Sequence, residues 1–263
     1  MDLGLKNKVA LVAAATRGLG RAVADELAAE GASLIICGRD ARTIAEAGAT
    51  IADKTNAHVL AVAADVSRPA DVARLAESAI TRFGRIDILV TNAGGPPAGT
   101  FETITQEQWD EAMRLTLFSA IELTRRVLPG MKERGWGRIL NITSITVKQP
   151  VDGLLLSNSL RAGLTGFART LANEVATYGI TVNNILPGYT RTERVEELAK
   201  IMAEKQGISA AEFKARWEQE IPMRRLGEPR EFAALATFLV SERASYITGA
   251  SVQVDGGWIK SIF

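Results

Sequence analysis

The first residues that could do chemistry follow the first apolar run of the chain. Residues 9–15 are apolar, and the sequence Thr16-Arg17-Gly18-Leu19-Gly20 comes directly after them. Apolar residues then recur at helical spacing from Ala22 to Ala28, so the glycines lie where a strand turns into a helix. Backbone N–H groups at such a turn, together with the helix dipole, can bind a pyrophosphate group. Taken alone, two glycines after a strand are equally consistent with an ordinary turn.

Two further candidate contacts end later apolar runs. Asp65 and Val66 end the run that begins at residue 59, where a carboxylate can accept a hydrogen bond from an adenine amino group. The alternative role for Asp65 is to cap a helix that begins near residue 70. Asn92, Ala93 and Gly94 end the run that begins at residue 86, and small residues there would let a cofactor approach the backbone.

The elements that must position these residues alternate along the chain. Short runs that are apolar on both faces predict parallel strands covered by helices on two sides. The expected strands are 9–15, 33–37, 59–64, 86–91, 138–143, 180–186 and 251–254, and the expected later helices are 41–54, 70–83, 106–132, 154–178 and 229–240. This order predicts the α/β class, a Rossmann-type doubly wound parallel sheet of seven strands with helices on both faces. Residues 1–263 form one dinucleotide-binding domain, within which 189–226 is expected to be a helical lid over the substrate.

Composition excludes several classes of function. The 31 Lys and Arg residues balance 30 Asp and Glu residues, so no basic field exists for nucleic acid. The single cysteine, Cys37, rules out an intrachain disulfide, and no Cys/His cluster exists for a structural metal. Neither a signal peptide nor an apolar run of about 20 residues is visible, so we expect a cytoplasmic protein without membrane contact.

The ordered motifs resemble those of the short-chain dehydrogenase/reductase family, and the likeness covers essentially the whole chain. The matching pieces are Ala14 to Gly20, Asp65, Asn92 to Gly94, Ser144, and Pro187-Gly188 with Thr192. The segment Tyr246 to Gly257 is similar to the ending of the ketoacyl reductase branch of that family. The resemblance implies a nicotinamide cofactor whose nicotinamide is positioned by Asn92 to Gly94 and by Pro187-Gly188.

The end of the second strand bears on which cofactor is used. Members of the family that prefer NAD place an acid there, whereas this chain has Gly38 followed by Arg39. Arg17 stands immediately before Gly18, and two guanidinium groups that converge on one ribose suit the 2′-phosphate of NADP(H). The alternative is that both arginines lie on the solvated surface.

The catalytic positions depart from the pattern that the resemblance implies. The family uses a serine, a tyrosine thirteen residues later and a lysine four residues after that. Here these positions hold Ser144, Ser157 and Arg161, and Thr116 replaces a helical asparagine of the proton relay. A serine hydroxyl titrates far above the phenol's pKa of about 10, and arginine is effectively never deprotonated. We therefore expect Ser144 and Ser157 to bind the carbonyl oxygen and Arg161 to stabilise the developing alkoxide charge.

The proton donor must then come from elsewhere. Lys148, four residues after Ser144, is our first candidate, with Tyr189 or a water held by Ser144, Ser157 and Arg161 as the other two. The alternative for Lys148 is a solvated loop lysine.

The resulting hypothesis is an NADP(H)-dependent oxidoreductase that reduces a carbonyl group or oxidises an alcohol of a small molecule. The alternative is a catalytically silent NADP(H)-binding sensor or oligomer partner. Family resemblance favours a homotetramer, with the helices 106–132 and 154–178 at one interface. Five arginines between residues 189 and 226 are compatible with an acidic substrate or with a solvated face; they are Arg191, Arg194, Arg216, Arg224 and Arg225.

Overall fold

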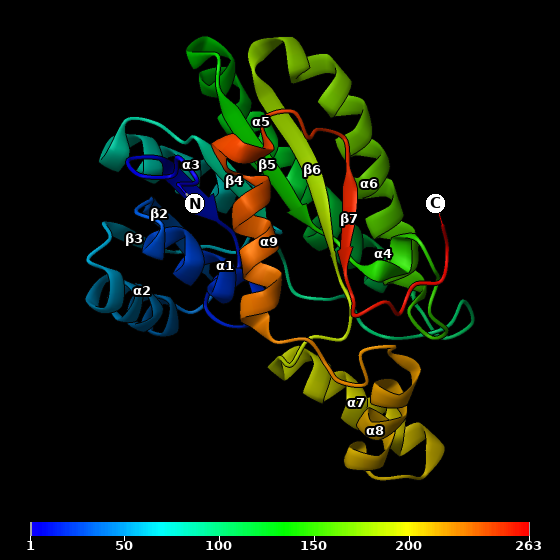
Figure 1. Ribbon diagram of the computed structural model, residues 1–263. Coiled ribbons are helices and arrows are strands. Elements are labelled where there is room, and N and C mark those ends of the chain that lie inside the picture. Colours follow the sequence, from blue (N-terminus) through cyan, green and yellow to red (C-terminus); the bar gives the residue numbers. More distant parts are fainter. Residues whose placement is uncertain (1, 263) are drawn as a thin grey trace.

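The computed structural model describes residues 2–262, except for the side chain of Lys205. Seven parallel strands form one sheet in the order β3-β2-β1-β4-β5-β6-β7 (Figure 1). The strands are β1 Val9–Val12, β2 Ser33–Gly38, β3 Val59–Ala63, β4 Ile88–Thr91, β5 Gly137–Ile142, β6 Ile180–Pro187 and β7 Ser251–Val254. The predicted fold class is confirmed.

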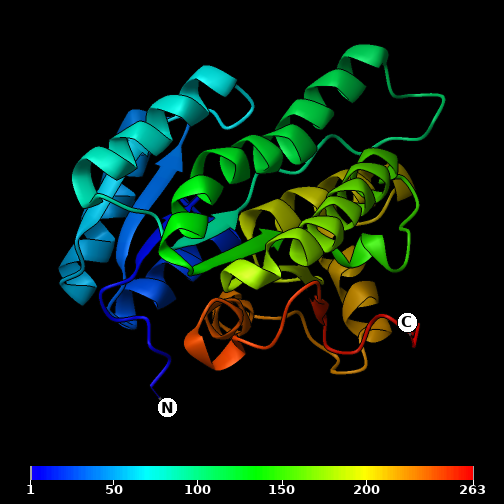
Figure 2. The same ribbon diagram turned by 90° about the horizontal axis from the view of Figure 1, so that it is seen from above.

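The helices cover both faces of the sheet. They are α1 Gly18–Ala29, α2 Ala41–Thr55, α3 Pro69–Phe83, α4 Gln106–Met113, α5 Ser119–Arg134, α6 Leu155–Val175, α7 Glu193–Gln206, α8 Ala210–Glu220 and α9 Pro229–Leu239. Figure 2 shows α3, α5 and α6 on one side of the sheet and α1 and α9 on the other. Among the described residues, no helix combines the length and apolar character that crossing a bilayer requires.

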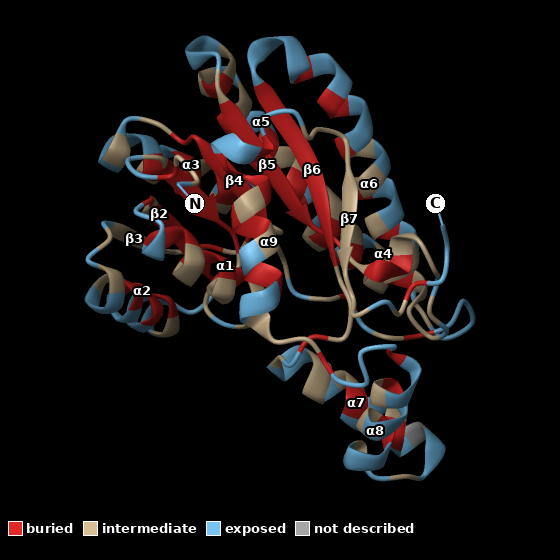
Figure 3. Cartoon of the chain, in the orientation of Figure 1, coloured by how far each residue is buried: buried red, intermediate tan, exposed pale blue. Residues whose placement is uncertain are grey.

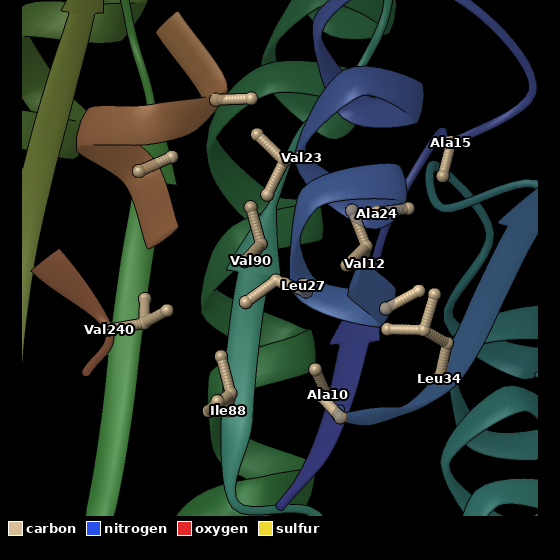
Figure 4. Close-up of a cluster of buried hydrophobic side chains, with 14 of the residues drawn as sticks. Ala10, Val12, Ala15, Val23, Ala24, Leu27, Leu34, Ile88, Val90 and Val240 are labelled. Carbon is tan, nitrogen blue, oxygen red and sulfur yellow. The ribbon is translucent and has the colours of Figure 1, made fainter. Parts of the chain in front are cut away.

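The strands supply both halves of a two-layered core. Ala10 and Val12 of β1 pack against α1, α2 and α9, whereas Val9 and Leu11 of the same strand pack against α3, α5 and α6. Figure 4 shows the first of these layers, with Leu27 of α1 directed at the strands. Figure 3 shows the central strands buried and the outer faces of the helices exposed, with the edge strand β7 only partly covered. Burial on both faces explains why the central strands β1, β2 and β4 are almost entirely apolar instead of alternating.

The strand order reverses direction between β1 and β4. β1 pairs with β2 on one side, where Ala10 is opposite Leu34, and with β4 on the other, where Ala10 is opposite Ile88. Ligands of open parallel sheets bind in the crevice that such a reversal leaves beyond the carboxyl ends of the strands. The loops that follow β1 and β4 are therefore placed to form a site.

Most boundaries differ from the sequence prediction by one to three residues, and two of the differences have a clear local cause. β1 ends at Val12 instead of Ala15, because the chain already turns there and Ala14 takes a φ of +48°. The expected helix 106–132 is divided by a π-helical turn, Arg114–Phe118, between α4 and α5. Thr116 lies in this turn, buried, and its hydroxyl has no hydrogen-bond partner within the described residues.

The segment 189–226 folds as two helices, α7 and α8, that pack on each other. Their shared core contains Ala199, Ala203, Phe213 and Trp217. Figure 1 shows the pair projecting from the main body beyond one end of the sheet. The predicted change of pattern after Gly188 thus corresponds to a helical pair with a small core of its own.

A comparison of two glycines tests how tightly the helix ends are packed. Gly84 and Gly179 both take left-handed conformations, with φ of +74° and +68°. A Cβ at Gly84 would meet nothing within 4 Å, whereas one at Gly179 would collide with the backbone carbonyl of Gly135. We expect Gly84→Ala to lower the free energy of unfolding by about 1 kcal/mol and Gly179→Ala by about 3 kcal/mol, because the second change also displaces backbone. Urea denaturation measures both, and equal losses would contradict this packing.

Candidate functional site

A cavity of about 560 Å³ lies where the loops after β1 to β6 meet the first turns of α7. Most of the residues predicted from the sequence to form the site line it: Ala14, Thr16, Arg17, Gly18, Leu19, Arg39, Asp65, Val66, Asn92, Ala93, Gly94, Ser144, Ser157, Arg161, Pro187, Gly188 and Thr192. Gly20 and Lys148 are not among the lining residues. The volume is in the range of small-molecule and cofactor sites.

The glycine turn leaves the start of α1 open to an anion. α1 begins at Gly18, whose φ is +63°, and its first turn has neither a side-chain cap nor an acidic residue. The first backbone N–H groups of a helix lack partners within the helix, and the dipole favours negative charge there. A phosphate group would therefore find donors at this end of the cavity.

Gly20 acts through packing and does not line the cavity. A Cβ at this position would lie 2.6 Å from the Ala14 carbonyl oxygen and 2.6 Å from Asn92 Nδ2. Those two atoms are joined by a hydrogen bond in which Asn92 donates, at 3.2 Å. The glycine thus lets α1 lie against the contact between the first turn and the loop after β4.

An acidic side chain at the end of β2 would have to displace the Thr16 side chain. A Cβ at Gly38 would overlap the hydroxyl oxygen of Thr16 and lie 3.4 Å from Ile44. Arg39 is exposed beside it and forms no ion pair within the described part of the chain. Arg17 pairs with Glu193 at the start of α7. The rim of the cavity here carries two guanidinium groups.

Asp65 organises the turn after β3. Its Oδ1 accepts hydrogen bonds from the backbone N–H of Ser67 at 2.9 Å and from the Ser67 hydroxyl at 2.7 Å. Asp71 in turn accepts from the backbone N–H of Asp65 at 2.9 Å. Arg68, not Asp65, is the residue that precedes α3 as its N-cap, so Asp65 shapes the turn without capping the helix. Cys37 is buried nearby, and burial raises the pKa of its thiol to about 11.

Ser144, Ser157 and Arg161 meet at the other end of the cavity. Ser144 follows β5, and its Oγ accepts from the backbone N–H of Thr146 at 3.1 Å, which leaves its hydroxyl proton free to be donated. Ser157 and Arg161 are four residues apart on α6 and so share one face of that helix.

Arg161 is fixed by the backbone at the end of β5. Its Nη1 donates to the carbonyl oxygens of Ile142 at 3.0 Å and Thr143 at 2.9 Å. Burial, and secondarily the charge of Arg194, lower the pKa of Arg161 to about 10. The guanidinium therefore stays charged at neutral pH.

The comparisons with known proteins identify the family. Residues 13–259 match the family described as enoyl-(acyl carrier protein) reductase. The chain is 37% identical over 267 residues to D-beta-hydroxybutyrate dehydrogenase of Cupriavidus necator, with 97% of this chain and 99% of that one covered. It is 33% identical over 257 residues to 3-oxoacyl-(acyl-carrier-protein) reductase of Aquifex aeolicus, with 98% and 99% covered. The chain belongs to the short-chain dehydrogenase/reductase family.

A solved structure of the family agrees over the full length of the chain. L-sorbose reductase from Gluconobacter frateurii, complexed with NADPH and L-sorbose, superposes with a TM-score of 0.94 at 35% identity and covers 100% of both chains. The short-chain dehydrogenase/reductase likeness that the motifs indicated is confirmed, and its relatives are named as dehydrogenases and reductases.

The structure places two of the proton-donor candidates of this short-chain dehydrogenase/reductase differently with respect to the cavity. Lys148 Nζ donates to Gln253 Oε1 of β7 at 2.7 Å and does not line the cavity. Tyr189 lines the cavity, but its ring stacks on Trp217 at 4.3 Å and meets Trp258 edge-on at 5.7 Å. Burial, and secondarily Glu220, raise the pKa of Tyr189 to about 12, so the phenol holds its proton more tightly than usual.

Arg194 is a charged lining residue that the sequence did not place in the site. It lies on the first turn of α7, two residues after Thr192, and its Nη2 donates to the Pro96 carbonyl oxygen at 2.9 Å. Sequence placed it among five arginines of one charged segment. The sequence carried no signal that distinguished it, because Arg191 lies still nearer to Thr192 in the chain and does not line the cavity.

Proposed function

We propose that this short-chain dehydrogenase/reductase is an NADP(H)-dependent oxidoreductase that reduces a carbonyl group or oxidises an alcohol. One observation carries the proposal: a single cavity joins an uncapped helix start flanked by two arginines to a cluster of two serines and a guanidinium. The first end suits a dinucleotide and the second suits a polarised carbonyl.

The residues present fit NADP(H). Arg39 and Arg17 would hold the 2′-phosphate, and the first turn of α1 would hold the pyrophosphate. Thr16 fills the space behind Gly38 in which an NAD-selective acid would have to stand. Asp65 and Val66 would contact the adenine, whereas Asn92 to Gly94, Pro187-Gly188 and Thr192 would position the nicotinamide. When bound, the cofactor supplies the hydride.

The chain's own residues would polarise the carbonyl. The hydroxyl groups of Ser144 and Ser157 donate to the carbonyl oxygen, and both line the same end of the cavity. Arg161, held by two backbone carbonyls, presents a fixed positive charge to the oxygen as negative charge develops on it. Fixed donors and charges stabilise such a transition state without reorganising.

We further propose that a water held by Ser144, Ser157 and Arg161 passes a proton from solvent to the alkoxide, in preference to donation by Lys148 or Tyr189. Lys148 is engaged with Gln253 and does not line the cavity, and the ring of Tyr189 is held against Trp217 and Trp258. Arg161 keeps its proton because its pKa, although lowered, is about 10. The hydroxyl groups of the two serines are then the groups that hold and orient the donor.

Cofactor selection tests the proposal first. Arg39→Asp should lower NADPH affinity about tenfold to hundredfold, because a charged contact to phosphate contributes roughly 1.5–3 kcal/mol, and should spare NADH. Arg42→Asp is the matched control, since Arg42 lies on α2, pairs with Glu46 at 3.1 Å and does not line the cavity. Fluorescence titration with both cofactors measures the ratio. An unchanged NADPH to NADH ratio in Arg39→Asp would refute the assignment.

The proton donor is tested by three single variants in steady-state assays with NADPH. Lys148→Met and Tyr189→Phe should keep turnover within about threefold, whereas Ser157→Ala should lower it about a hundredfold by releasing the donor water. A loss of tenfold or more in Lys148→Met, with NADPH affinity unchanged, would give the role to Lys148 instead.

The alternative function is a silent NADP(H)-binding sensor, and the observation that favours it is that neither Ser157 nor Arg161 can exchange a proton readily. If the natural chain turns over no carbonyl, the double variant Ser157→Tyr with Arg161→Lys decides the matter. Reductase activity gained in that variant would show that the rest of the site is competent and that the natural chain is silent.

We also propose that the chain forms a symmetric homotetramer through the outer faces of α5 and α6. Phe118 is 50% exposed before α5, and α6 presents exposed Ala162, Gly163 and Gly166, which would let another helix approach closely. A Cβ at Gly166 meets nothing within 4 Å, so Gly166→Arg should leave the protomer folded while blocking the interface. Light scattering should show a tetramer for the natural chain and a smaller species for the variant; a 28.2 kDa natural species would overturn the proposal.

A further inference from the structure

Two guanidinium groups from different elements line the end of the cavity where Ser144 and Ser157 lie, which we call its reaction end. Arg161 comes from α6 and Arg194 from α7, and both line the cavity. Arg161 donates only to backbone carbonyls, and no carboxylate pairs with it within the residues that the structure describes. Arg161 is half-buried and Arg194 is exposed, and two like charges that share this end of the cavity, one of them without a carboxylate partner, favour binding of an anion there.

Arg194 is held over the cavity by the loop after β4. Its Nη2 donates to the Pro96 carbonyl oxygen at 2.9 Å, and its Nε would lie 3.0 Å from a Cβ at Gly95. Its nearest carboxylate, Glu197, is 3.9 Å away, and both side chains are about half exposed. Such a long, solvated pair contributes little.

The other four arginines of this segment are used elsewhere. Arg191 pairs with Glu228 at 3.1 Å, Arg216 with Glu212 at 3.0 Å and Arg225 with Glu231 at 2.7 Å. Arg224 donates to the backbone carbonyl of Gln219. None of these four lines the cavity. The interpretation as a solvated face is therefore sufficient for these four, whereas Arg194, although also partly solvated, lines the cavity.

The acidic groups that face the cavity do not neutralise its reaction end. Glu193 is paired with Arg17, and Asp65 is engaged by Ser67 beside the end of β3. Glu197 has only its long contact with Arg194. The charge of Arg194 contributes to the lowered pKa of Arg161, as expected of two like charges that share one cavity.

We propose that the substrate is a small oxo acid, or the corresponding hydroxy acid, whose carboxylate is bound by Arg194 while Ser144 and Ser157 hold its carbonyl or hydroxyl oxygen. The inference rests on the proposed oxidoreductase function and adds the substrate class. A planar guanidinium already oriented by a backbone carbonyl matches a carboxylate in two-point contact. The carboxylate is chemically unchanged by the reaction. It fixes the position of the substrate and neutralises positive charge at this end of the cavity.

Titration calorimetry on the full-length chain, with and without saturating NADP⁺, tests the substrate class independently of turnover. The probes are 2-oxobutanoate and 4-oxopentanoate, each compared with its methyl ester, which has the same carbonyl but no charge. At least one acid should bind tenfold or more tightly than its ester. Arg194→Gln should remove that advantage while leaving ester binding and NADPH affinity unchanged.

Arg191→Gln is the matched control, because Arg191 also lies beside the start of α7 but pairs with Glu228 outside the cavity. It should behave as the natural chain does. Equal affinities for acids and esters, or binding of neither, would overturn the proposal, as would a loss of NADPH affinity in Arg194→Gln, which would make Arg194 a cofactor contact. Acid binding that depends on Arg194 in a chain that transfers no hydride would support the ligand class and refute the oxidoreductase function.

Discussion

The hydrogen bond from Asn92 to the Ala14 carbonyl oxygen holds the two halves of the site together. It spans the point where the strand order reverses, and it ties the turn after β1 to the loop after β4. Ala14 adopts a left-handed φ to present that carbonyl, and Gly20 lacks a side chain so that α1 can lie against both groups. The open start of α1 and the small residues after β4 consequently face one cavity.

Sequence predicted the fold because its determinants are local. The strands are short and mostly apolar, and in the helices apolar residues recur at helical spacing. The alternation of strands and helices can therefore be recognised from the sequence without tertiary information. The π-helical turn at Arg114–Phe118 was not predictable in this way, since the helical pattern continues through it and only packing reveals the extra residue.

The predicted site residues gather as expected where position in the sheet decides their place. Ser144, Ser157 and Arg161 meet because one follows β5 and the other two share a face of α6. The partners of long side chains were not predictable. Lys148 lies 105 residues before Gln253, to which it donates, and spacing from Ser144 gave no indication of that contact. Arg194 was likewise indistinguishable from neighbouring arginines until the loop carrying Pro96 was placed beside it.

The ion pair between Arg17 and Glu193 joins the rim of the glycine turn to the first residue of α7. A single guanidinium serves this pair, so an anion that binds Arg17 competes with Glu193 for the same positive charge. Because the two equilibria are linked, a change that strengthens the ion pair between Arg17 and Glu193 lowers the affinity for the anion by the same factor. Because exposed ion pairs contribute about 0.2–1 kcal/mol, this linkage amounts to no more than about fivefold. The position of the α7–α8 pair is therefore weakly linked to anion binding at the glycine turn through the charge of Arg17.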